Sequence, residues 1–317
     1  MLKESRYKAD MLSEFEQMKS VGSHVNIAGL IGICTSMHNT VWLLMEYAEE
    51  GNLKAFLRRN RPNLHRSSSA SSCDDQQQHI RELTYRDLVS ASHQIANGMN
   101  YLVQKKCVHR DLAARNVLVT REYAMKISDF GLARNVVSKD YYRKKTKGHL
   151  PYKWMALEAL TENVFTHATD VWSFGVLLWE VFTLGNSPYP GLKTNDLVSY
   201  LRAGNRLKQP EYSTPLLHRL MKDCWDEAPL RRPSFRQLLE DFKLMLDSTS
   251  EDDRPLSNML SVTSGARQRM ESVQTTTIDL SDIPSPCTGS ESYNGFEFGE
   301  DPGAAAESTA LMQESNF

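Results

Sequence analysis

Apolar residues near the start of the chain follow two spacings, one typical of a helix and one typical of strands. A spacing of three or four residues predicts a helix that Gly22 ends. The apolar members of this pattern are Met11, Phe15, Met18 and Val21. Two strand-like runs follow at 27–34 and 40–47, and the polar residues 36–39 between them predict a turn.

Beyond residue 82 the helical spacing dominates. Residues 84–87 (Thr-Tyr-Arg-Asp) form a capping-box pattern before a helix whose apolar face is Leu88, Ile95, Met99 and Leu102. A strand pair is expected at 117–119 and 125–127, and an irregular stretch then runs to about residue 155. Further helices are expected at 171–183, 197–202, 216–225 and 235–245. A small strand-bearing part followed by a larger helical part predicts an α+β protein with two lobes.

Two polar stretches interrupt or end these patterns. The first, at 61–78, is rich in Ser, Asp and Gln, and the second, from about Ser248 to Phe317, is rich in Ser, Thr, Asp, Glu and Gly. Neither can bury enough apolar area to order itself. We therefore expect a small lobe at 1–48, a large lobe at 49–247 with a disordered insert at about 61–81, and a disordered acidic tail at 248–317.

Charge and cysteine usage add little to this picture. The formal net charge is −2, and from Glu251 onward 12 acidic residues face three arginines, so the body before the tail is mildly basic. A basic body suits a partner with phosphate or acidic peptide, although a solvated surface explains it as well. The five cysteines lack the spacing of a zinc site or a disulfide framework, which fits reduced thiols in the cytosol.

The chain shows no targeting or membrane-spanning pattern. Its N-terminus has no apolar signal-peptide core. The longest apolar run, 171–184, is interrupted by Ser173 and Glu180 and is too short to span a bilayer. A buried core helix is the expected structure of this run.

The sharpest chemical signal is the sequence His-Arg-Asp-Leu-Ala-Ala-Arg-Asn at 109–116, which Ser-Asp-Phe-Gly follows at 128–131. In this order and at this distance, these are the catalytic-loop and metal-binding motifs of protein kinases. Phosphoryl transfer needs a carboxylate to accept the proton of the attacking hydroxyl, and Asp111 suits this role. It also needs oxygen ligands for the Mg²⁺ that neutralises the phosphates of ATP, and Asn116 and Asp129 provide them. Each residue alone would be a cap or a surface charge, but together they predict a kinase.

A closer likeness extends over several longer segments. The segments are 82–89 (ELTYRDLV), 107–134, 140–146 (DYYRKKT), 150–156 (LPYKWMA) and 170–177 (DVWSFGVL). They resemble the kinase domains of the fibroblast growth factor receptors. The resemblance runs from Met1 to about Leu246 and is interrupted by the insert, which lies where split receptor kinases carry theirs. It does not include the tail.

Two places indicate tyrosine as the substrate residue. Arg115 stands four residues after Asp111, as in receptor tyrosine kinases, whereas serine/threonine kinases usually place a lysine two residues after the aspartate. A phenol is longer than an alkyl hydroxyl, so the basic group has to lie further along the loop. Residues 151–154 (Pro-Tyr-Lys-Trp) resemble the platform that supports the substrate ring. These residues could also simply pack, and Trp154 is expected to do both.

The resemblance also implies a set of nucleotide-binding residues. Met45 would be the gatekeeper, and Leu118 would lie under the adenine ring of ATP. Glu14 matches the helix glutamate that pairs with the ATP-anchoring lysine. The backbone groups that bind adenine would be those of the hinge residues Glu46, Tyr47 and Ala48.

Other residues are implied to regulate or support the site. Tyr141 and Tyr142 resemble paired autophosphorylation sites whose phosphates would pair with Arg110 and order the loop, with ordinary exposed tyrosines as the alternative. Glu158 is implied to pair with Arg232. Leu157 stands where the family has proline, and some loosening is expected from this change. Structural or regulatory roles are further implied for His109, Arg110, Phe130, Gly131 and Asp170.

One part of the family pattern is absent from the sequence. No Gly-rich phosphate loop and no Val-Ala-Val-Lys segment precede Glu14, and Lys3 falls at the wrong strand position to be the ATP-anchoring lysine. Three of the five small-lobe strands are therefore expected to be missing, and low activity is expected of this chain. Two interpretations stay open, a fragment of an active receptor kinase or a noncatalytic, pseudokinase-like binding or scaffold module. The intact Asp111, Asn116 and Asp129 favour the first.

The expected partners follow from the family likeness. They are tyrosine-containing protein substrates and a second kinase domain for trans-autophosphorylation, and no nucleic acid is expected. Tyr293, which has an acidic flank, is expected to dock phosphotyrosine-binding adaptors, with an unremarkable tail residue as the alternative. By analogy the chain is the cytoplasmic part of a single-pass plasma-membrane receptor.

Overall fold

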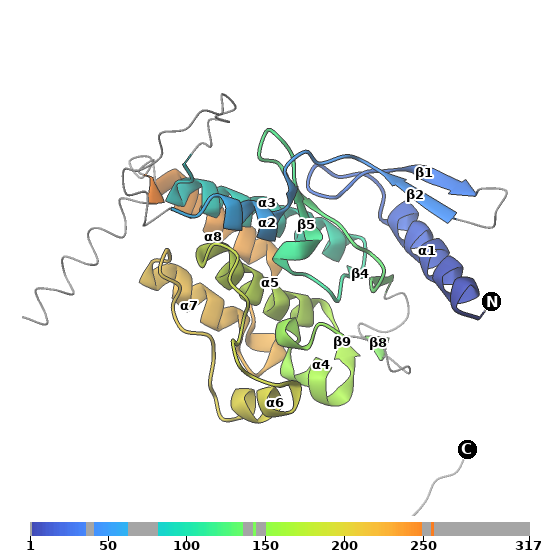
Figure 1. Ribbon diagram of the computed structural model, residues 1–317. Coiled ribbons are helices and arrows are strands. Elements are labelled where there is room, and N and C mark those ends of the chain that lie inside the picture. Colours follow the sequence, from blue (N-terminus) through green and yellow to red (C-terminus); the bar gives the residue numbers. More distant parts are fainter. Residues whose placement is uncertain are drawn as a thin grey trace, which may run out of the picture. The chain divides into compact units, whose positions relative to one another are not determined.

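The computed structural model describes residues 2–35, 41–62, 82–135, 142–143, 150–248 and 255–256. Within these residues the chain forms a small part with one helix and a two-stranded sheet, and a larger part that is mostly helical (Figure 1). The expected α+β class is confirmed.

The small part begins with helix α1, Leu2–Val21, which starts earlier than the apolar pattern alone predicts. Gly22 ends it with a positive φ of 79°, a conformation that glycine adopts without steric cost. Strands β1, Leu30–Thr35, and β2, Val41–Met45, follow and pair in antiparallel register, with Leu30 opposite Met45. Ile31 is 70% exposed and Trp42 62% exposed, so this sheet leaves large apolar side chains in solvent.

The strand predicted at 27–34 begins later than expected, because its first residues join the larger part instead. Ile27 forms a parallel bridge with Ile127, and the Ala28 N–H donates to the Ile127 carbonyl at 2.8 Å. Asn26 reinforces this link, since its side-chain amide donates to the Met125 carbonyl at 3.0 Å. This stretch therefore ties the small part to the larger one.

The larger part carries the remaining elements. In chain order they are β3 (Gly51–Asn52), α2 (Leu53–Arg59), α3 (Tyr85–Gln104), β4 (Cys107–Val108), the 3-10 helix η1 (Ala114–Asn116), β5 (Val117–Val119), β6 (Met125–Ile127), β7 (Arg134–Asn135), β8 (Tyr142–Arg143), the 3-10 helix η2 (Tyr152–Trp154), α4 (Leu157–Glu162), β9 (Val164–Phe165), α5 (His167–Phe182), α6 (Thr194–Arg202), α7 (Pro215–Cys224), the 3-10 helix η3 (Pro229–Arg231) and α8 (Phe235–Ser248). Its strands form a sheet in the order β3-β5-β6 and the pairs β4-β7 and β8-β9.

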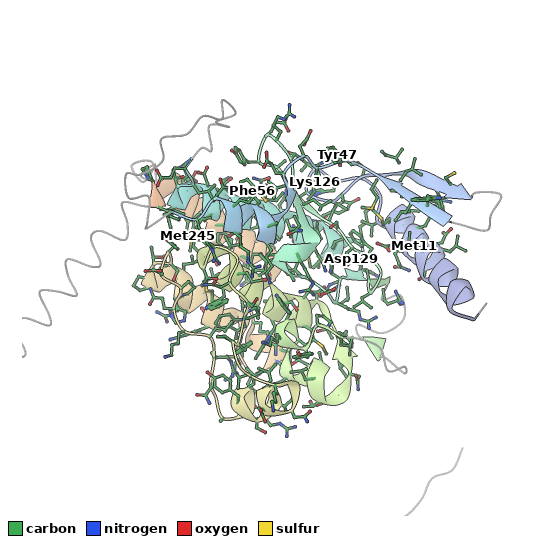
Figure 2. The ribbon with its side chains drawn as sticks, viewed as in Figure 1. Met11, Tyr47, Phe56, Lys126, Asp129 and Met245 are labelled. Carbon is green, nitrogen blue, oxygen red and sulfur yellow. The ribbon has the colours of Figure 1, made fainter. Side chains whose placement is uncertain are left out.

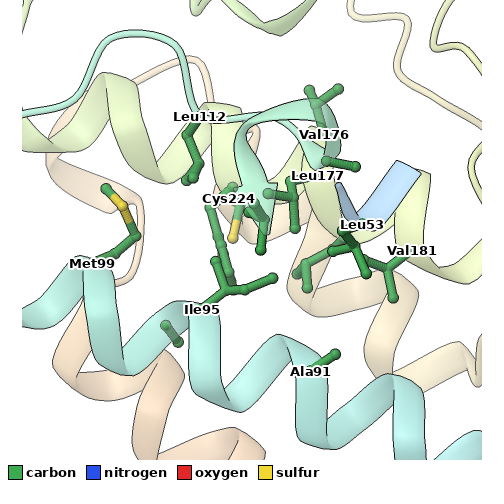
Figure 3. Close-up of a cluster of buried hydrophobic side chains, with 14 of the residues drawn as sticks. Leu53, Ala91, Ile95, Met99, Leu112, Val176, Leu177, Val181 and Cys224 are labelled. Carbon is green, nitrogen blue, oxygen red and sulfur yellow. The ribbon is translucent and has the colours of Figure 1, made fainter. Parts of the chain in front are cut away.

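Helix α5 lies at the centre of the core. Nearly all of its side chains are buried, as the long apolar run predicts. Figure 3 shows Ile95 of α3 and Leu177 of α5 in one apolar cluster with Leu53 of α2. No helix in the described part of the chain is long and apolar enough to cross a membrane.

The start of α3 agrees with its sequence signature. The Thr84 hydroxyl accepts the Asp87 N–H at 3.1 Å, and the Asp87 carboxylate accepts the Thr84 N–H at 2.9 Å. This reciprocal capping box is the one predicted. The predicted apolar face is buried along its whole length, at Leu88, Ile95, Met99 and Leu102.

Each of the two polar segments contains a described residue with defined contacts. Arg61 is held, because its guanidinium donates to the Leu184 carbonyl and to Asn186 Oδ1, both at 2.8 Å. Within the stretch predicted to be a tail, Leu256 is fully buried and donates its N–H to the Leu83 carbonyl at 3.0 Å. One apolar residue in a polar stretch gives no periodic signal, and therefore the pattern could not reveal this contact.

We expect Leu256→Ala to lower the free energy of unfolding by roughly 2 kcal/mol, the lower end of the range for a buried leucine, because a short segment can partly relax. Urea unfolding of the variant measures the loss. Leu244→Ala is the matched control, since Leu244 is 67% exposed on α8. Equal unfolding midpoints for the two variants would contradict the packing role of Leu256.

Candidate functional site

One buried carboxylate of α5 anchors the residues 109–116. Asp170 is fully buried, and its oxygens accept hydrogen bonds from the backbone N–H groups of His109 at 2.8 Å and Arg110 at 2.9 Å. Burial raises the pKa of Asp170 to about 7, and these two hydrogen bonds oppose the rise. Arg110 has a φ of 70°, so the two bonds fix a backbone conformation that residues other than glycine seldom adopt.

His109 links the two sequence motifs. Its Nδ1 accepts the Asp111 N–H at 3.3 Å, so Nε2 carries the proton and donates to the Ser128 carbonyl at 3.1 Å. Burial lowers the pKa of His109 to about 4, and the ring is therefore neutral near pH 7. The ring also packs edge-on against Phe130, with 5.3 Å between the ring centroids. The two motifs are thereby held together.

Asp111 is surrounded by polar groups of its own loop. Its carboxylate pairs with the Arg115 guanidinium, and its backbone carbonyl accepts a hydrogen bond from Asn116 Nδ2 at 2.8 Å. Because Asn116 uses its amide nitrogen here, its side-chain oxygen remains as a group that could bind a metal ion. Burial raises the pKa of Asp111 to about 6, and the charge of Arg115 opposes the rise. A desolvated carboxylate of this kind is suited to accept a proton.

Glu14 and Asp129 converge at Gly131. A side chain at Gly131 would place its Cβ 3.3 Å from Asp129 Oδ1 and 3.7 Å from Glu14 Oε2, so both carboxylates reach this glycine (Figure 2 labels Asp129). Burial raises the pKa of Glu14, and the nearby charge of Asp129 adds to the rise. The Asp129 carboxylate and the side-chain oxygen of Asn116 are hard oxygen donors, the kind of ligand that Mg²⁺ prefers.

The predicted hinge is fixed by the side chain of Glu46. Its Oε1 lies 2.7 Å from Lys126 Nζ, and its Oε2 accepts the Gly29 N–H at 3.1 Å. The hydrogen bond with Lys126 is the main cause that lowers the pKa of Glu46. The Glu46 side chain therefore serves the hinge structure, and only its backbone could face a nucleotide.

The other predicted nucleotide-binding residues lie around this hinge. The Glu46 N–H donates to the Gly29 carbonyl at 2.8 Å, and the Ala48 carbonyl accepts the Gly51 N–H at 3.2 Å. These bonds leave the Glu46 carbonyl and the Ala48 N–H as candidates to bind adenine. Tyr47 is 79% exposed (Figure 2). Met45 ends β2, and Leu118, in the middle of β5, is half-buried.

Glu158 and Arg232 form the ion pair that the family resemblance implies. The Arg232 guanidinium donates to Glu158 Oε1 at 2.6 Å and to Oε2 at 3.0 Å. The guanidinium also donates to the Ala168 carbonyl at 2.9 Å, so it joins the start of α4 to the start of α5. Leu157 is buried at the first position of α4.

The predicted substrate platform contains a contact that sequence reasoning missed. Trp154 donates its indole N–H to Glu180 Oε2 at 2.9 Å, and the Arg115 guanidinium lies 4.4 Å from the Trp154 ring centroid. Glu180 stands in the sequence only as a polar interruption of an apolar run. A single carboxylate within a helix predicted to be buried is a signal that could have revealed this role, because a buried charge needs a partner.

The predicted phosphorylation sites are only partly described. Tyr141 and Tyr293 lie outside the described residues. The backbone of Tyr142 pairs with Phe165, and the Arg110 guanidinium lies 4.4 Å from the centroid of the Phe165 ring. Arg110 is thus near the strand pair that contains Tyr142.

Comparison with protein families gives one extended match. Residues 1–242 match the family model described as protein tyrosine and serine/threonine kinase. This range contains every described site residue named above.

Three curated relatives are similar to the chain over most of its length. A fibroblast growth factor receptor of Ciona intestinalis is 59% identical over 253 residues, which are 79% of this chain and 34% of that protein. One from Halocynthia roretzi is 56% identical, over 80% of this chain and 34% of that protein. Fibroblast growth factor receptor 1 of Xenopus laevis is 49% identical, over 77% of this chain and 30% of that protein. The chain spans about a third of the length of these relatives.

Proposed function

Because this chain belongs to the protein tyrosine and serine/threonine kinase family, we propose that it is part of the catalytic domain of a receptor-type protein tyrosine kinase. Such an enzyme transfers the γ-phosphoryl group of ATP to tyrosine. The observation that carries the proposal is the joint anchoring of Asp111, Asn116 and Asp129. Asp170 and His109 hold the first loop and join it to the second.

In this proposal each residue of the loops has one task. Asp111 accepts the proton of the substrate hydroxyl and orients its oxygen. Asn116 and Asp129 would hold Mg²⁺, which neutralises the charge of the ATP phosphates. The backbone of Glu46 and Ala48 would bind adenine above Leu118. Arg115 and Trp154 would receive the longer side chain of tyrosine, since their contact lies beside Asp111.

We further propose that this 317-residue chain has low activity by itself. Its sequence contains neither a Gly-rich loop nor a Val-Ala-Val-Lys segment before Glu14. Burial and the neighbouring carboxylate of Asp129 raise the pKa of Glu14. The second candidate is a noncatalytic binding or scaffold module, and the intact Asp111, Asn116 and Asp129 favour the kinase over it.

The surroundings of the kinase are proposed by likeness to the receptors. The kinase is proposed to lie on the cytoplasmic side of the plasma membrane and to act on tyrosine-containing protein substrates. A second kinase domain is proposed to phosphorylate Tyr141 and Tyr142. Tyr293 is proposed to bind adaptors after phosphorylation. Failure of an active relative to phosphorylate a Tyr293 peptide would remove that last role.

The deciding experiment measures Mg²⁺-dependent ATP binding and tyrosine phosphorylation by two proteins. One is this chain, and the other is an extended form with a Gly-rich loop and a lysine-bearing strand added before Met1. We expect activity from the extended form and little from the chain alone. Activity of neither form would favour the noncatalytic module, and equal activity of both would show that another group replaces the lysine.

A further inference from the structure

Three elements meet at the carboxylate of Glu180, which lies fully buried in α5. Its Oε2 accepts hydrogen bonds from the backbone N–H of Ala114 in η1 and from the indole N–H of Trp154 in η2, both at 2.9 Å. One oxygen atom therefore bridges the catalytic loop and the proposed substrate platform. Hydrogen bonds to an ionised acceptor are roughly twice as strong as neutral ones, so the charge of Glu180 matters for both.

The other oxygen of Glu180 faces a cation from a fourth element. Oε1 lies 3.5 Å from Lys54 Nζ of α2, and it is buried without a hydrogen bond from any residue in the described part of the chain. A buried charge without a partner is strongly unfavourable. Burial raises the pKa of Glu180, while its two hydrogen bonds and the charge of Lys54 oppose the rise. The charge of Arg115 also opposes the rise, and Lys54 is the cation within 4 Å of Oε1 in the described part of the chain.

The same contacts continue to the proposed catalytic aspartate. The Arg115 guanidinium lies 4.4 Å and the Lys54 ammonium 5.8 Å from the centroid of the Trp154 ring, both within the range of cation–π attraction. Arg115 in turn pairs with Asp111. Two cations and two carboxylates therefore alternate from Lys54 to Asp111, with the indole of Trp154 between them.

We propose that Glu180 and Lys54 are positioning residues for tyrosine phosphorylation. They fix the position of the platform residue Trp154 relative to the loop that carries Asp111. The inference rests on the proposed function. The Lys54 ammonium favours the charged form of Glu180, and the charged form holds the Ala114 N–H and the Trp154 indole. Lys54 itself touches no reacting group, so it acts only through this chain of contacts.

Lys54 is well suited to a mutational test. Its side chain is 19% exposed, so Lys54→Met keeps the packing of the stem and is expected to fold. Lys54→Arg keeps the charge. Arg59→Met is the matched control on the same helix, because Arg59 is 53% exposed and its ion pair is with the half-buried Glu50, away from Glu180.

The first measurement uses the chain as it is and needs no activity. The indole N–H resonance of Trp154, assigned with Trp154→Phe, reports the bond to Glu180 directly. We expect this resonance to move in Lys54→Met and in Glu180→Gln, and to stay in place in Lys54→Arg and Arg59→Met. An unchanged resonance in both Lys54→Met and Glu180→Gln would overturn the inference.

The second measurement uses the extended form. We expect Lys54→Met to lower kcat/KM for a tyrosine peptide by about 10-fold, within the loss of up to about 100-fold that a small misplacement can cause. The KM for ATP should stay unchanged, and Lys54→Arg should restore the peptide reaction. Equal losses for both substrates, or no rescue by arginine, would overturn the positioning role. If the extended form without any substitution is inactive, the proposed function is refuted instead. The Trp154 resonance would then still decide the inference about Glu180 and Lys54.

Discussion

Asp111→Asn is expected to lower tyrosine phosphorylation by the extended form about 10²–10⁴-fold, the usual contribution of a general base. Asparagine keeps the shape of the side chain and cannot accept the proton. The backbone bonds of residue 111 with His109 and Asn116 remain possible. Burial raises the pKa of Asp111, so the ionised form is held at a cost in stability, and we expect the melting temperature of the variant to stay equal or to rise.

Paired measurement of kcat and melting temperature checks this expectation. Asp247→Asn is the matched control, since Asp247 is exposed near the end of α8. It should leave both quantities unchanged. Activity of Asp111→Asn close to that of Asp247→Asn would remove Asp111 as the base. A large fall in melting temperature would instead show that Asp111 is mainly a structural residue.

Arg232→Met is expected to lower the free energy of unfolding by about 3–5 kcal/mol, the usual cost of breaking a buried ion pair. The Arg232 side chain is fully buried, and its removal leaves the carboxylate of Glu158, itself 15% exposed, without its cation. The carbonyls of Ala168 and Asp226 lose a donor as well. Urea unfolding followed by tryptophan fluorescence measures the change.

Two further variants test the cause of that loss. Arg231→Met is the control, because Arg231 is the exposed neighbour in the same sequence. The double variant with Arg232→Met and Glu158→Gln should lose less free energy of unfolding than the sum of the losses of the two single variants. The reason is that the double variant leaves neither charge of the pair buried without its partner. An Arg232→Met protein as stable as Arg231→Met would show that the pair contributes nothing.

Features with a local sequence signature were predictable. The capping box at Thr84 and the buried face of α3 depend on residues three or four positions apart, and both are present. The site motifs at 109–116 and 128–131 are short and chemically specific, so Asp111, Asn116 and Asp129 could be singled out from the sequence. The pairing of Glu158 with Arg232 came from family likeness and is present as well.

Features that depend on contacts between distant segments were not predictable. Glu180 acquires its role from Lys54, Ala114 and Trp154, which lie far from it along the chain. Ile27 leaves its expected strand because a partner in β6 offers a bridge. In each case the residue itself gives no hint of its partner, because the fold alone brings the two together.

The bond between Leu256 and Leu83 also sets the distance between two polar segments of the chain. Leu83 lies two residues after the insert, and Leu256 belongs to the tail, yet the Leu256 nitrogen lies 3.0 Å from the Leu83 carbonyl oxygen. Groups attached to Glu82 and to Pro255 would therefore share an effective concentration of about millimolar order, as for ligands joined by a short linker. A partner with one binding module for each segment would gain avidity from this geometry without any new contact, and detachment of Leu256 would remove that gain.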